Sequence, residues 1–282
     1  IDTGDWIQVT EDAETKFVGY TQMETNSTII KYRHVKAKGK EAYQWVLSET
    51  PFYAESGGQV GDSGTLNFED GTLLQVTDTK KENNLFIHFT DTIPNVIGEK
   101  VKAQVAITQR KNTTLHHSAT HLLHAALRNV LGKHVAQKGS LVNAEQLRFD
   151  FSHFSKVSDE ELQQIEDIIN EKIRANIPVV IKEMTKDEAV ALGAMALFGE
   201  KYGDVVRVVS VGDWARELCG GTHVARSGQL GVIKLLSESS IGAGVRRVEA
   251  LVGVDAYKFL AREHILLNSL TDLIKGARAE EL

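Results

Sequence analysis

Two short pairs of metal-binding residue types, about a hundred positions apart, constrain this chain more than any other feature. His117 and His121 lie four residues apart in a stretch with a helical pattern, and Cys219 and His223 have the same spacing in a later segment. On a helix, positions i and i+4 share one face with Cβ atoms about 5–6 Å apart, so two imidazoles can bind one ion. Three nitrogens and one thiolate suit tetrahedral zinc. The sequence therefore predicts a fold that brings both segments together around Zn²⁺.

Each pair alone has an ordinary structural explanation. A histidine on an apolar helix usually packs in a core, and a single cysteine usually behaves as a small buried apolar residue. A His-Glu-x-x-His metalloprotease has a glutamate beside the first ligand as general base, whereas Ser118 stands at that place here. The pattern therefore does not favour a protease. Of the neighbouring histidines, we expect His124 to pack beside the site and His116 to face outward.

Composition indicates an ordinary soluble protein, and the length favours two domains. The 282 residues are 42% hydrophobic and 25% charged, without an apolar window long enough for a membrane span or a signal segment. The single cysteine excludes an internal disulfide, so we expect a cytoplasmic location. Because no window could span a membrane, we expect no membrane partner. A formal net charge of −6 argues against a protein that coats nucleic acid, so any RNA contact must be local.

The pattern of strands and helices predicts an α+β fold in three parts. Residues 1–108 contain short apolar runs at the spacing of a small β-barrel, with a glycine-rich loop at 51–64. Residues 109–254 mix helices and strands without strict alternation, which favours a largely antiparallel sheet. Residues 255–282 have the pattern of a C-terminal helix, and the start at Ile1 without methionine suggests a piece of a longer protein.

The individual elements follow from local patterns. Strands are predicted at 28–32, 44–47, 73–76, 85–89, 101–105, 147–151, 178–181, 205–211, 231–236 and 245–252. Helices are predicted from about 112 to 132, from 158 to 175, from 185 to 193 and from 255 onward. The second helix opens with the capping box Ser158-Asp-Glu-Glu161.

The glycine-rich loop contains four glycines within eight residues, which is too many for a strand. Glycine lets the backbone adopt positive φ and approach a partner closely. The loop lacks the Gly-Lys-Ser/Thr ending of a phosphate-binding loop. A plain cluster of turns would explain the same composition.

Four short motifs occur in the order that one known family shows. They are Glu55-Ser-Gly-Gly-Gln59, His117-Ser-Ala-Thr-His121, Cys219-Gly-Gly-Thr-His223 and Gly244-Val-Arg-Arg-Val-Glu249. Together they resemble the editing region of bacterial-type alanyl-tRNA synthetases, which is shared with the free-standing AlaX editing proteins. The editing domain of threonyl-tRNA synthetase has a similar His/Cys/His set but lacks the glycine-rich loop. Nothing in the chain resembles the class II aminoacylation motifs or an ATP site, so we expect these upstream of Ile1.

The resemblance implies a hydrolase that removes serine or glycine from the 3′ end of tRNA(Ala). The parent enzyme would ligate alanine to this tRNA with ATP. The implied partners are the acceptor end of tRNA(Ala) and the upstream catalytic and downstream C-terminal domains of the same chain. The chemistry is compatible, because an alanine pocket cannot exclude glycine by size and rejects one added hydroxyl only weakly.

The resemblance also implies roles for individual residues. Thr120 and Gln137 match family positions linked to selectivity and are the catalytic candidates. Their ordinary alternatives are a threonine that packs in a helix and a surface amide. Substrate contacts are implied for Gly57, Gly58 and Gln59.

The arginines of the fourth motif are candidates for a phosphate contact. Arg246 and Arg247 alternate faces on a predicted strand, so at most one can meet substrate while the other reaches solvent or pairs with a carboxylate. Arg247 is the substrate-binding candidate.

Four protein ligands ordinarily fill the coordination sphere of zinc, whereas hydrolysis by a metal-activated water needs an open coordination position. Two schemes for the role of zinc are therefore possible. In the first, Cys219 is absent or displaced as a ligand, and zinc polarises the ester carbonyl or activates water. In the second, zinc anchors the substrate amino group or shapes the pocket, and a water held by Gln137, Thr120 or a ribose hydroxyl attacks. The second is favoured slightly, because the motifs show no adjacent carboxylate base.

The alternatives to an editing part of a synthetase are a non-catalytic, zinc-stabilised tRNA-binding module and a free-standing AlaX-type protein.

Overall fold

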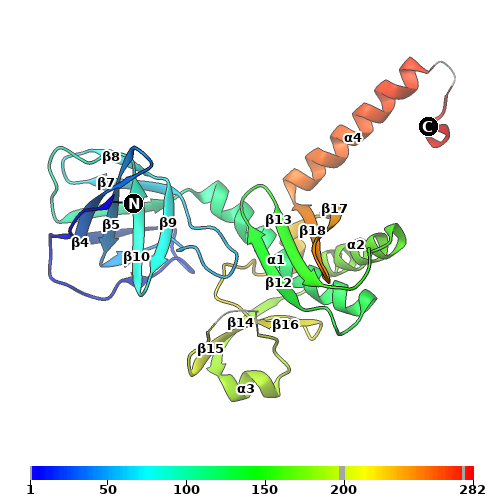
Figure 1. Cartoon of the computed structure of the whole chain (residues 1–282), viewed down its shortest axis with the longest axis horizontal. Coiled ribbons are helices and arrows are strands. Elements are labelled where there is room, and N and C mark those ends of the chain that lie inside the picture. Colours follow the sequence, from blue (N-terminus) through cyan, green and yellow to red (C-terminus); the bar gives the residue numbers. More distant parts are fainter. Residues whose placement is uncertain (1, 197–200, 275–276) are drawn as a thin grey trace. The chain divides into compact units, whose positions relative to one another are not determined.

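The computed structural model describes residues 2–196, 201–274 and 277–282, which form two compact units (Figure 1). Unit 1 comprises residues 1–114, 141–144 and 220–222. Unit 2 comprises residues 115–140, 145–219 and 223–282. Two short segments, 141–144 and 220–222, therefore belong to unit 1 although the chain on both sides of them belongs to unit 2.

Unit 1 is built on an antiparallel sheet, drawn in blue to cyan in Figure 1. The strand order is β8 (Leu73–Val76), β7 (Gly64–Phe68), β11 (Lys100–Val105), β4 (Glu24–Ala37), β5 (Lys40–Leu47), β10 (Leu85–Thr90) and β9 (Asp78–Glu82). The short strands β1 (Asp2–Thr3) and β2 (Ile7–Gln8) also pair with β4. A separate parallel pair consists of β3 (Lys16–Phe17) and β6 (Glu49–Thr50).

The sheet of unit 1 is open. Among the described residues, the path of paired strands runs from β8 to β9 without closing, so the predicted small β-barrel is not confirmed. The period-two pattern is present, since β11 alternates exposed residues with the buried Val101, Ala103 and Val105. The period-two pattern indicates which face of a strand is buried. Whether a sheet closes into a barrel depends on the stagger between its strands, and the pattern contains no information on that stagger.

Unit 2 combines helices with two antiparallel sheets. The larger sheet has the order β12 (Gln137–Val142), β13 (Leu147–Ser152), β18 (Val245–Val252) and β17 (Ile233–Gly242). The smaller has the order β14 (Val179–Thr185), β15 (Val205–Val211) and β16 (Ala215–Leu218). The α-helices within the described ranges are α1 (Ile107–Leu131), α2 (Asp159–Arg174), α3 (Lys186–Ala191) and α4 (Val254–Leu273), with 3₁₀ turns at Ser227–Leu230 and Ala279–Glu281. The predicted α+β class, antiparallel sheets and C-terminal helix are thus confirmed.

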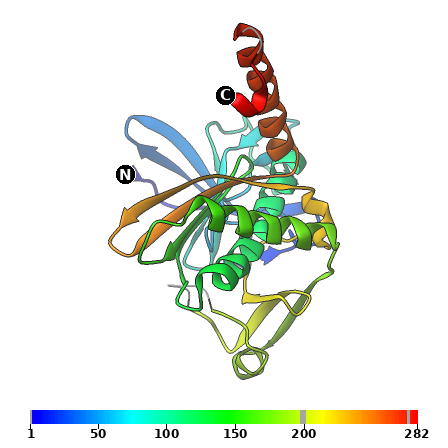
Figure 2. The ribbon, with the colours of Figure 1, turned by 90° about the vertical axis from the view of Figure 1, so that its right-hand side faces the viewer.

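Helices α1 and α2, both green in Figure 2, share one core with the larger sheet. This core includes Leu123 of α1, Phe149 of β13 and Val248 of β18, all fully buried. Helix α2 begins where the sequence predicts, because the Ser158 side chain accepts a hydrogen bond from the Glu161 backbone N–H. The core surrounds much of α1 and thereby buries the polar side chains that this helix carries.

Several boundaries differ from the predictions. Helix α1 begins at Ile107, before the predicted change of pattern at Asn112. Strands β7, β9, β12 and β16 and the two-residue strands β1, β2, β3 and β6 were not predicted, because most of them are short or polar. In the part of the chain that the structure describes, we find no helix both long and apolar enough to cross a membrane.

Candidate metal centre

The two predicted pairs of metal-binding residues lie together in unit 2. One ligand atom from each of His117, His121, Cys219 and His223 lies within 4.8 Å of the other three. The Cys219 Sγ is 3.4 Å from His117 Nε2 and 3.2 Å from His223 Nε2. Bonds of about 2.0–2.3 Å to a tetrahedral zinc ion would separate its ligands by about 3.3–3.8 Å. The donor set and its spacing therefore fit zinc with small adjustments.

Helix and strand geometry position these side chains. On α1, the rings of His117 and His121 stack with centroids 5.4 Å apart, as i and i+4 residues do. The ring of His223 lies 4.7 and 4.8 Å from theirs. Cys219 directly follows β16, and its backbone N–H donates to the carbonyl of Arg207 on β15 over 3.0 Å. The thiol is thus held next to a sheet, the imidazoles of His117 and His121 by a helix, and that of His223 by the segment that follows Cys219.

Ser118 ties the segment that carries His223 to α1. The backbone N–H of Val224 donates to Ser118 Oγ over 3.0 Å, and the same oxygen is 3.1 Å from His223 Nδ1. A hydrogen bond at Nδ1 leaves Nε2 of this ring directed at the Cys219 thiol. Sequence reasoning considered Ser118 only as a missing glutamate, but its hydroxyl orients a candidate ligand.

Glu217 is a buried carboxylate beside the site that sequence reasoning missed. Its side chain is 2% exposed, with Oε2 at 3.2 Å from His121 Nδ1 and Oε1 at 3.1 Å from His124 Nδ1. A carboxylate therefore lies beside the site, although the motifs made no adjacent carboxylate base evident. A signal was present in the sequence, because Glu217 stands two residues before Cys219 in a strand, where i and i+2 side chains share a face.

The other two histidines of α1 are both buried. His124 packs beside the site as expected, with its ring centroid 5.2 Å from that of Phe149. His116 does not face outward, and this expectation is corrected. It is fully buried, and its Nε2 accepts a hydrogen bond of 3.2 Å from the backbone N–H of Val252. The end of β18 covers the side of α1 that the local pattern assigned to solvent.

Burial and neighbouring charges shift the pKa values in this cluster. Burial alone would raise the pKa of the Cys219 thiol, but the imidazoles of His117, His223 and His121 hold it well below its usual value. Burial would likewise raise the pKa of Glu217, but His121 and His124 lower it to about 2. The thiolate is the form of cysteine that binds zinc, so the surroundings favour metal binding.

The imidazoles respond in opposite directions. Burial alone would lower the pKa of His121, yet the charges of Glu217 and Cys219 raise it to about 10. The pKa of His223 falls to about 3, chiefly because its burial disfavours the charged ring. The charge of Glu217 therefore contributes to the difference between the pKa values of His121 and His223.

The two catalytic candidates have different surroundings. Thr120 is buried on α1, and its hydroxyl donates to the carbonyl of His116 over 2.8 Å, so its oxygen can still accept a hydrogen bond. Gln137 is half-buried at the start of β12, and its side-chain nitrogen is 3.3 Å from Ser140 Oγ. Their catalytic roles stay predictions.

The glycine-rich loop is tightly folded within unit 1. Gly57 and Gly58 have φ angles of 58° and 85°, which residues with a Cβ rarely adopt. Gln59 is fully buried, and its amide donates to Thr222 Oγ1 over 2.9 Å and accepts from the Thr222 N–H over 3.0 Å. The loop thus holds Thr222, and contact of Gly57, Gly58 or Gln59 with a substrate stays a prediction.

Both arginines of the fourth motif have carboxylate partners. Arg247 donates through Nε and Nη2 to the two oxygens of Asp150 on β13, over 2.7 and 3.0 Å. Arg246 donates through Nε to Glu238 on β17. A phosphate contact by Arg247 stays a prediction, and it would have to compete with Asp150.

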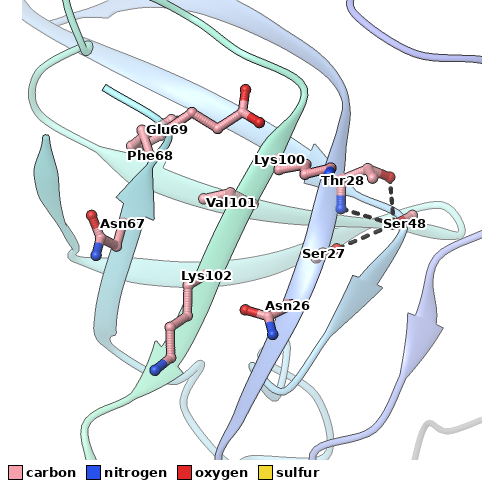
Figure 3. Close-up of a pocket in the computed structure, with 10 residues that line it drawn as sticks. All are labelled: Asn26, Ser27, Thr28, Ser48, Asn67, Phe68, Glu69, Lys100, Val101 and Lys102. Atoms are coloured by element: carbon pink, nitrogen blue, oxygen red, sulfur yellow. Dashed lines mark hydrogen bonds between the residues drawn. The ribbon is translucent and has the colours of Figure 1, made fainter. Parts of the chain in front are cut away.

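A surface hollow of unit 1 lies between strands β4, β7 and β11 (Figure 3). Asn26, Asn67 and Lys102 lie along it, and the backbone N–H and hydroxyl of Thr28 bond to Ser48 Oγ at its side. None of the residues predicted to bind metal or substrate lines this hollow.

Comparison with known proteins places the chain among aminoacyl-tRNA synthetases. Residues 206–249, which include Cys219 and His223, match the family described as threonyl and alanyl tRNA synthetase second additional domain. The alanine–tRNA ligase of Cytophaga hutchinsonii is 54% identical over 280 residues, which cover 99% of this chain and 32% of that protein. Over nearly its whole length the chain thus matches a segment of alanyl-tRNA synthetases. The resemblance of the four motifs is thereby confirmed.

Other alanine–tRNA ligases give the same result. That of Parabacteroides distasonis is 51% identical over 275 residues, covering 97% of this chain and 31% of the relative. That of a Thermoanaerobacter species is 48% identical over 276 residues, which cover 95% of this chain and 31% of the relative. The chain spans about a third of the length of these relatives.

A second family model matches the first part of the chain. Residues 4–109 match the family described as tRNA synthetases class II (A). The sequence was expected to lack the class II aminoacylation motifs and an ATP site, and this match does not test that expectation. Likeness to the class II family therefore extends into unit 1.

Proposed function

We propose that this chain is an editing part of an alanyl-tRNA synthetase and hydrolyses the ester of Ser-tRNA(Ala) and Gly-tRNA(Ala). The observation that carries the proposal is the convergence of His117, His121, Cys219 and His223. Two of them stand in the segment that matches the additional domain of threonyl and alanyl tRNA synthetases. A separate hydrolytic site is useful to such an enzyme, because an alanine pocket discriminates weakly against glycine and serine.

The proposed metal is Zn²⁺, held by three imidazoles and the Cys219 thiolate. When bound, zinc would supply a positive charge that can polarise the ester carbonyl or anchor the substrate amino group. Because four protein ligands ordinarily leave no open position, we favour the scheme in which the chain's own side chains hold the attacking water.

Thr120 and Gln137 are proposed to act on the substrate. The Thr120 hydroxyl hydrogen is bonded to the His116 carbonyl, so its oxygen is suited to accept from the hydroxyl of a seryl group. Alanine has no such hydroxyl and would leave the buried oxygen without that partner, so this contact would favour seryl- over alanyl-tRNA. Glycine lacks the hydroxyl too, so Thr120 does not account for the proposed hydrolysis of glycyl-tRNA. Gln137 is half-buried on β12 and is proposed to hold the attacking water through its amide.

The remaining roles concern the nucleic acid and the larger protein. We propose that Gly57, Gly58, Gln59 and Arg247 contact the acceptor end of tRNA(Ala). We also propose functional parts at residues 1–108, 109–254 and 255–282, and that upstream catalytic and downstream C-terminal domains complete the protein. The relatives are alanine–tRNA ligases, so the proposed parent reaction is ATP-dependent attachment of alanine to tRNA(Ala) in the cytoplasm.

The test combines metal content with hydrolysis. We would measure zinc per chain and the hydrolysis of seryl-, glycyl- and alanyl-tRNA(Ala), for the unaltered chain and for Cys219→Ala and Gln137→Ala. We expect about one zinc per chain and selective loss of serine and glycine. Gln137→Ala should slow hydrolysis without zinc loss, because its amide is not part of the ligand set. Hydrolysis of alanyl-tRNA as fast as seryl-tRNA would contradict an editing role.

A second candidate is a zinc-stabilised tRNA-binding module without catalytic activity. The closed set of four ligands favours it, since structural zinc sites ordinarily have such a set. Bound zinc and bound tRNA(Ala) without hydrolysis of any ester would support this candidate over the editing enzyme.

A further inference from the structure

We propose that Glu217 is a positioning residue whose carboxylate accepts one hydrogen bond from His121 and one from His124, and so keeps His121 Nε2 free for a metal ion. This inference rests on the proposed metal centre and assigns a function to a residue outside the ligand set. It concerns unit 2 alone, to which Glu217 and both histidines belong.

The first step is the direction of the two hydrogen bonds. Glu217 Oε2 is 3.2 Å from His121 Nδ1, and Oε1 is 3.1 Å from His124 Nδ1. A carboxylate can only accept, so both Nδ1 atoms must carry hydrogen. In the neutral ring this places the lone pair on Nε2, which is the form that binds a metal.

The second step is the state of the opposite nitrogens. Nε2 of His121 and Nε2 of His124 are buried and have no hydrogen-bond partner among the described residues. Buried polar atoms in proteins are nearly always bonded, so unpartnered ones require an explanation. For His121 the explanation is the convergence of its ligand atom with those of His117, Cys219 and His223.

The third step is the delivery of the carboxylate by the sheet. Glu217 pairs with Val209 of β15, and Cys219 follows two residues later, on the same side of an extended chain. His124 follows His121 by three residues on α1, one turn along the same face. One strand therefore provides a ligand and the group that orients another ligand.

The fourth step explains why the residue is a carboxylate. Glu217 is 2% exposed, and a buried charge is costly unless it is paired and hydrogen-bonded. A glutamine would accept at its oxygen and donate at its nitrogen, so it could not satisfy two N–H donors at once. One of the two histidines would then have to move its hydrogen to Nε2. Only the carboxylate holds His121 and His124 in the same tautomer together.

The experiment compares Glu217→Gln with His124→Gln in the 282-residue chain. His124→Gln removes the second histidine but offers the Glu217 oxygen an amide N–H, so the bond to His121 is retained. The zinc dissociation constant is measured by competition with a chelating dye. Loss of the group that orients a metal-binding histidine typically weakens binding by roughly 10–100-fold. We expect an increase of that size for Glu217→Gln and much less than tenfold for His124→Gln.

Histidine tautomers provide the readout that a merely structural role would not change. Nitrogen-detected NMR of ¹⁵N-histidine-labelled, zinc-loaded protein should show hydrogen on Nδ1 of both His121 and His124. In Glu217→Gln, His124 should change to the Nε2–H tautomer, because His121 must keep its Nε2 free for zinc. If Glu217→Gln does not fold, Glu217→Asp replaces it, since its shorter carboxylate cannot reach both rings and should also weaken zinc binding.

The outcomes separate the two proposals. Unchanged zinc affinity and unchanged tautomers in the Glu217 variants overturn the positioning role. Absence of zinc binding by the unaltered chain overturns that role together with the metal centre. Zinc binding with the expected tautomers but without ester hydrolysis overturns only the deacylase proposal, because neither measurement uses a substrate.

Discussion

Buried histidines in the two units differ in how fully their ring nitrogens are bonded. In unit 1, Nδ1 of the fully buried His88 donates to the Trp45 carbonyl over 2.9 Å, and Nε2 accepts from the Thr50 hydroxyl over 2.7 Å. In unit 2, His121 and His124 bond to Glu217 through Nδ1, and their Nε2 atoms have no partner in the described ranges. Both nitrogens of His88 are thus used within unit 1, whereas the unpartnered Nε2 of His121 is available to a ligand.

Buried charges show the same contrast. In unit 1, the Arg110 guanidinium donates to the Asp62 carboxylate and to the carbonyls of Gly19 and Pro51, with 2% and 5% exposure of the two charged side chains. This ion pair is complete. In unit 2, the low pKa values of Cys219 and Glu217 leave two anionic groups facing imidazoles. The buried charge of Arg110 and Asp62 is thus paired within unit 1, whereas the cluster in unit 2 has the donor atoms for a cation.

The largest expected effect is on the complete ion pair of unit 1. Arg110→Met leaves the Asp62 carboxylate buried without its cation, which should lower the free energy of unfolding by about 3–5 kcal/mol. Urea unfolding followed by tryptophan fluorescence, which includes the buried Trp45 of unit 1, measures the change. A decrease of the unfolding free energy by less than about 1 kcal/mol would show that this buried ion pair contributes little to the stability of unit 1.

A second prediction concerns pH and His88. Burial lowers the pKa of His88 to about 4 from the ordinary 6.5, so the folded protein holds it neutral where the unfolded chain takes up a proton. Its contribution to stability is complete above pH 6.5 and is lost as the pH falls toward 4. This difference corresponds to about 3 kcal/mol. Unfolding free energies from pH 7 to 4 should therefore fall more steeply for the unaltered chain than for His88→Gln, and equal slopes would refute the assignment.

Metal removal should affect the cluster of unit 2. If zinc is bound, a chelator should lower the unfolding free energy of the unaltered chain, by about 2.7 kcal/mol when free zinc had been at 100 times its dissociation constant. Cys219→Ala should respond much less, because it lacks the thiolate of the ligand set. Calorimetry with and without chelator measures both. An equal response of the two proteins would mean that Cys219 is not a ligand.

The smallest effect is expected at an exposed pair of unit 1. Arg33 Nη2 is 3.0 Å from Glu82 Oε2, but the Glu82 side chain is 57% exposed. Exposed pairs contribute about 0–1 kcal/mol, so Glu82→Ala should change the unfolding free energy by less than about 1 kcal/mol. The same urea titration provides the control for Arg110→Met. A loss as large as that of Arg110→Met would mean that burial does not distinguish the two pairs.

Local patterns were sufficient for much of the fold. The predicted strands 73–76, 205–211 and 245–252 coincide with β8, β15 and β18, and Ser158 caps α2 as its sequence indicates. These features depend on neighbours within a few residues, so periodicity and capping chemistry report them.

The sequence by itself determined which residues could bind a metal, through the spacing of His117 with His121 and of Cys219 with His223. Only the tertiary structure decided which groups surround them. Periodicity indicates which side of a helix is apolar, but it does not indicate which other segment covers the remaining sides. His116 was therefore expected to face solvent, although β18 buries it. The partner of His124 is 93 residues away in the chain, so the spacing of Glu217 and Cys219 could point to a shared side but not to this hydrogen bond. Hydrogen-bond partners of buried side chains are chosen by packing between distant segments, and in this protein that packing decides which ring nitrogens remain available.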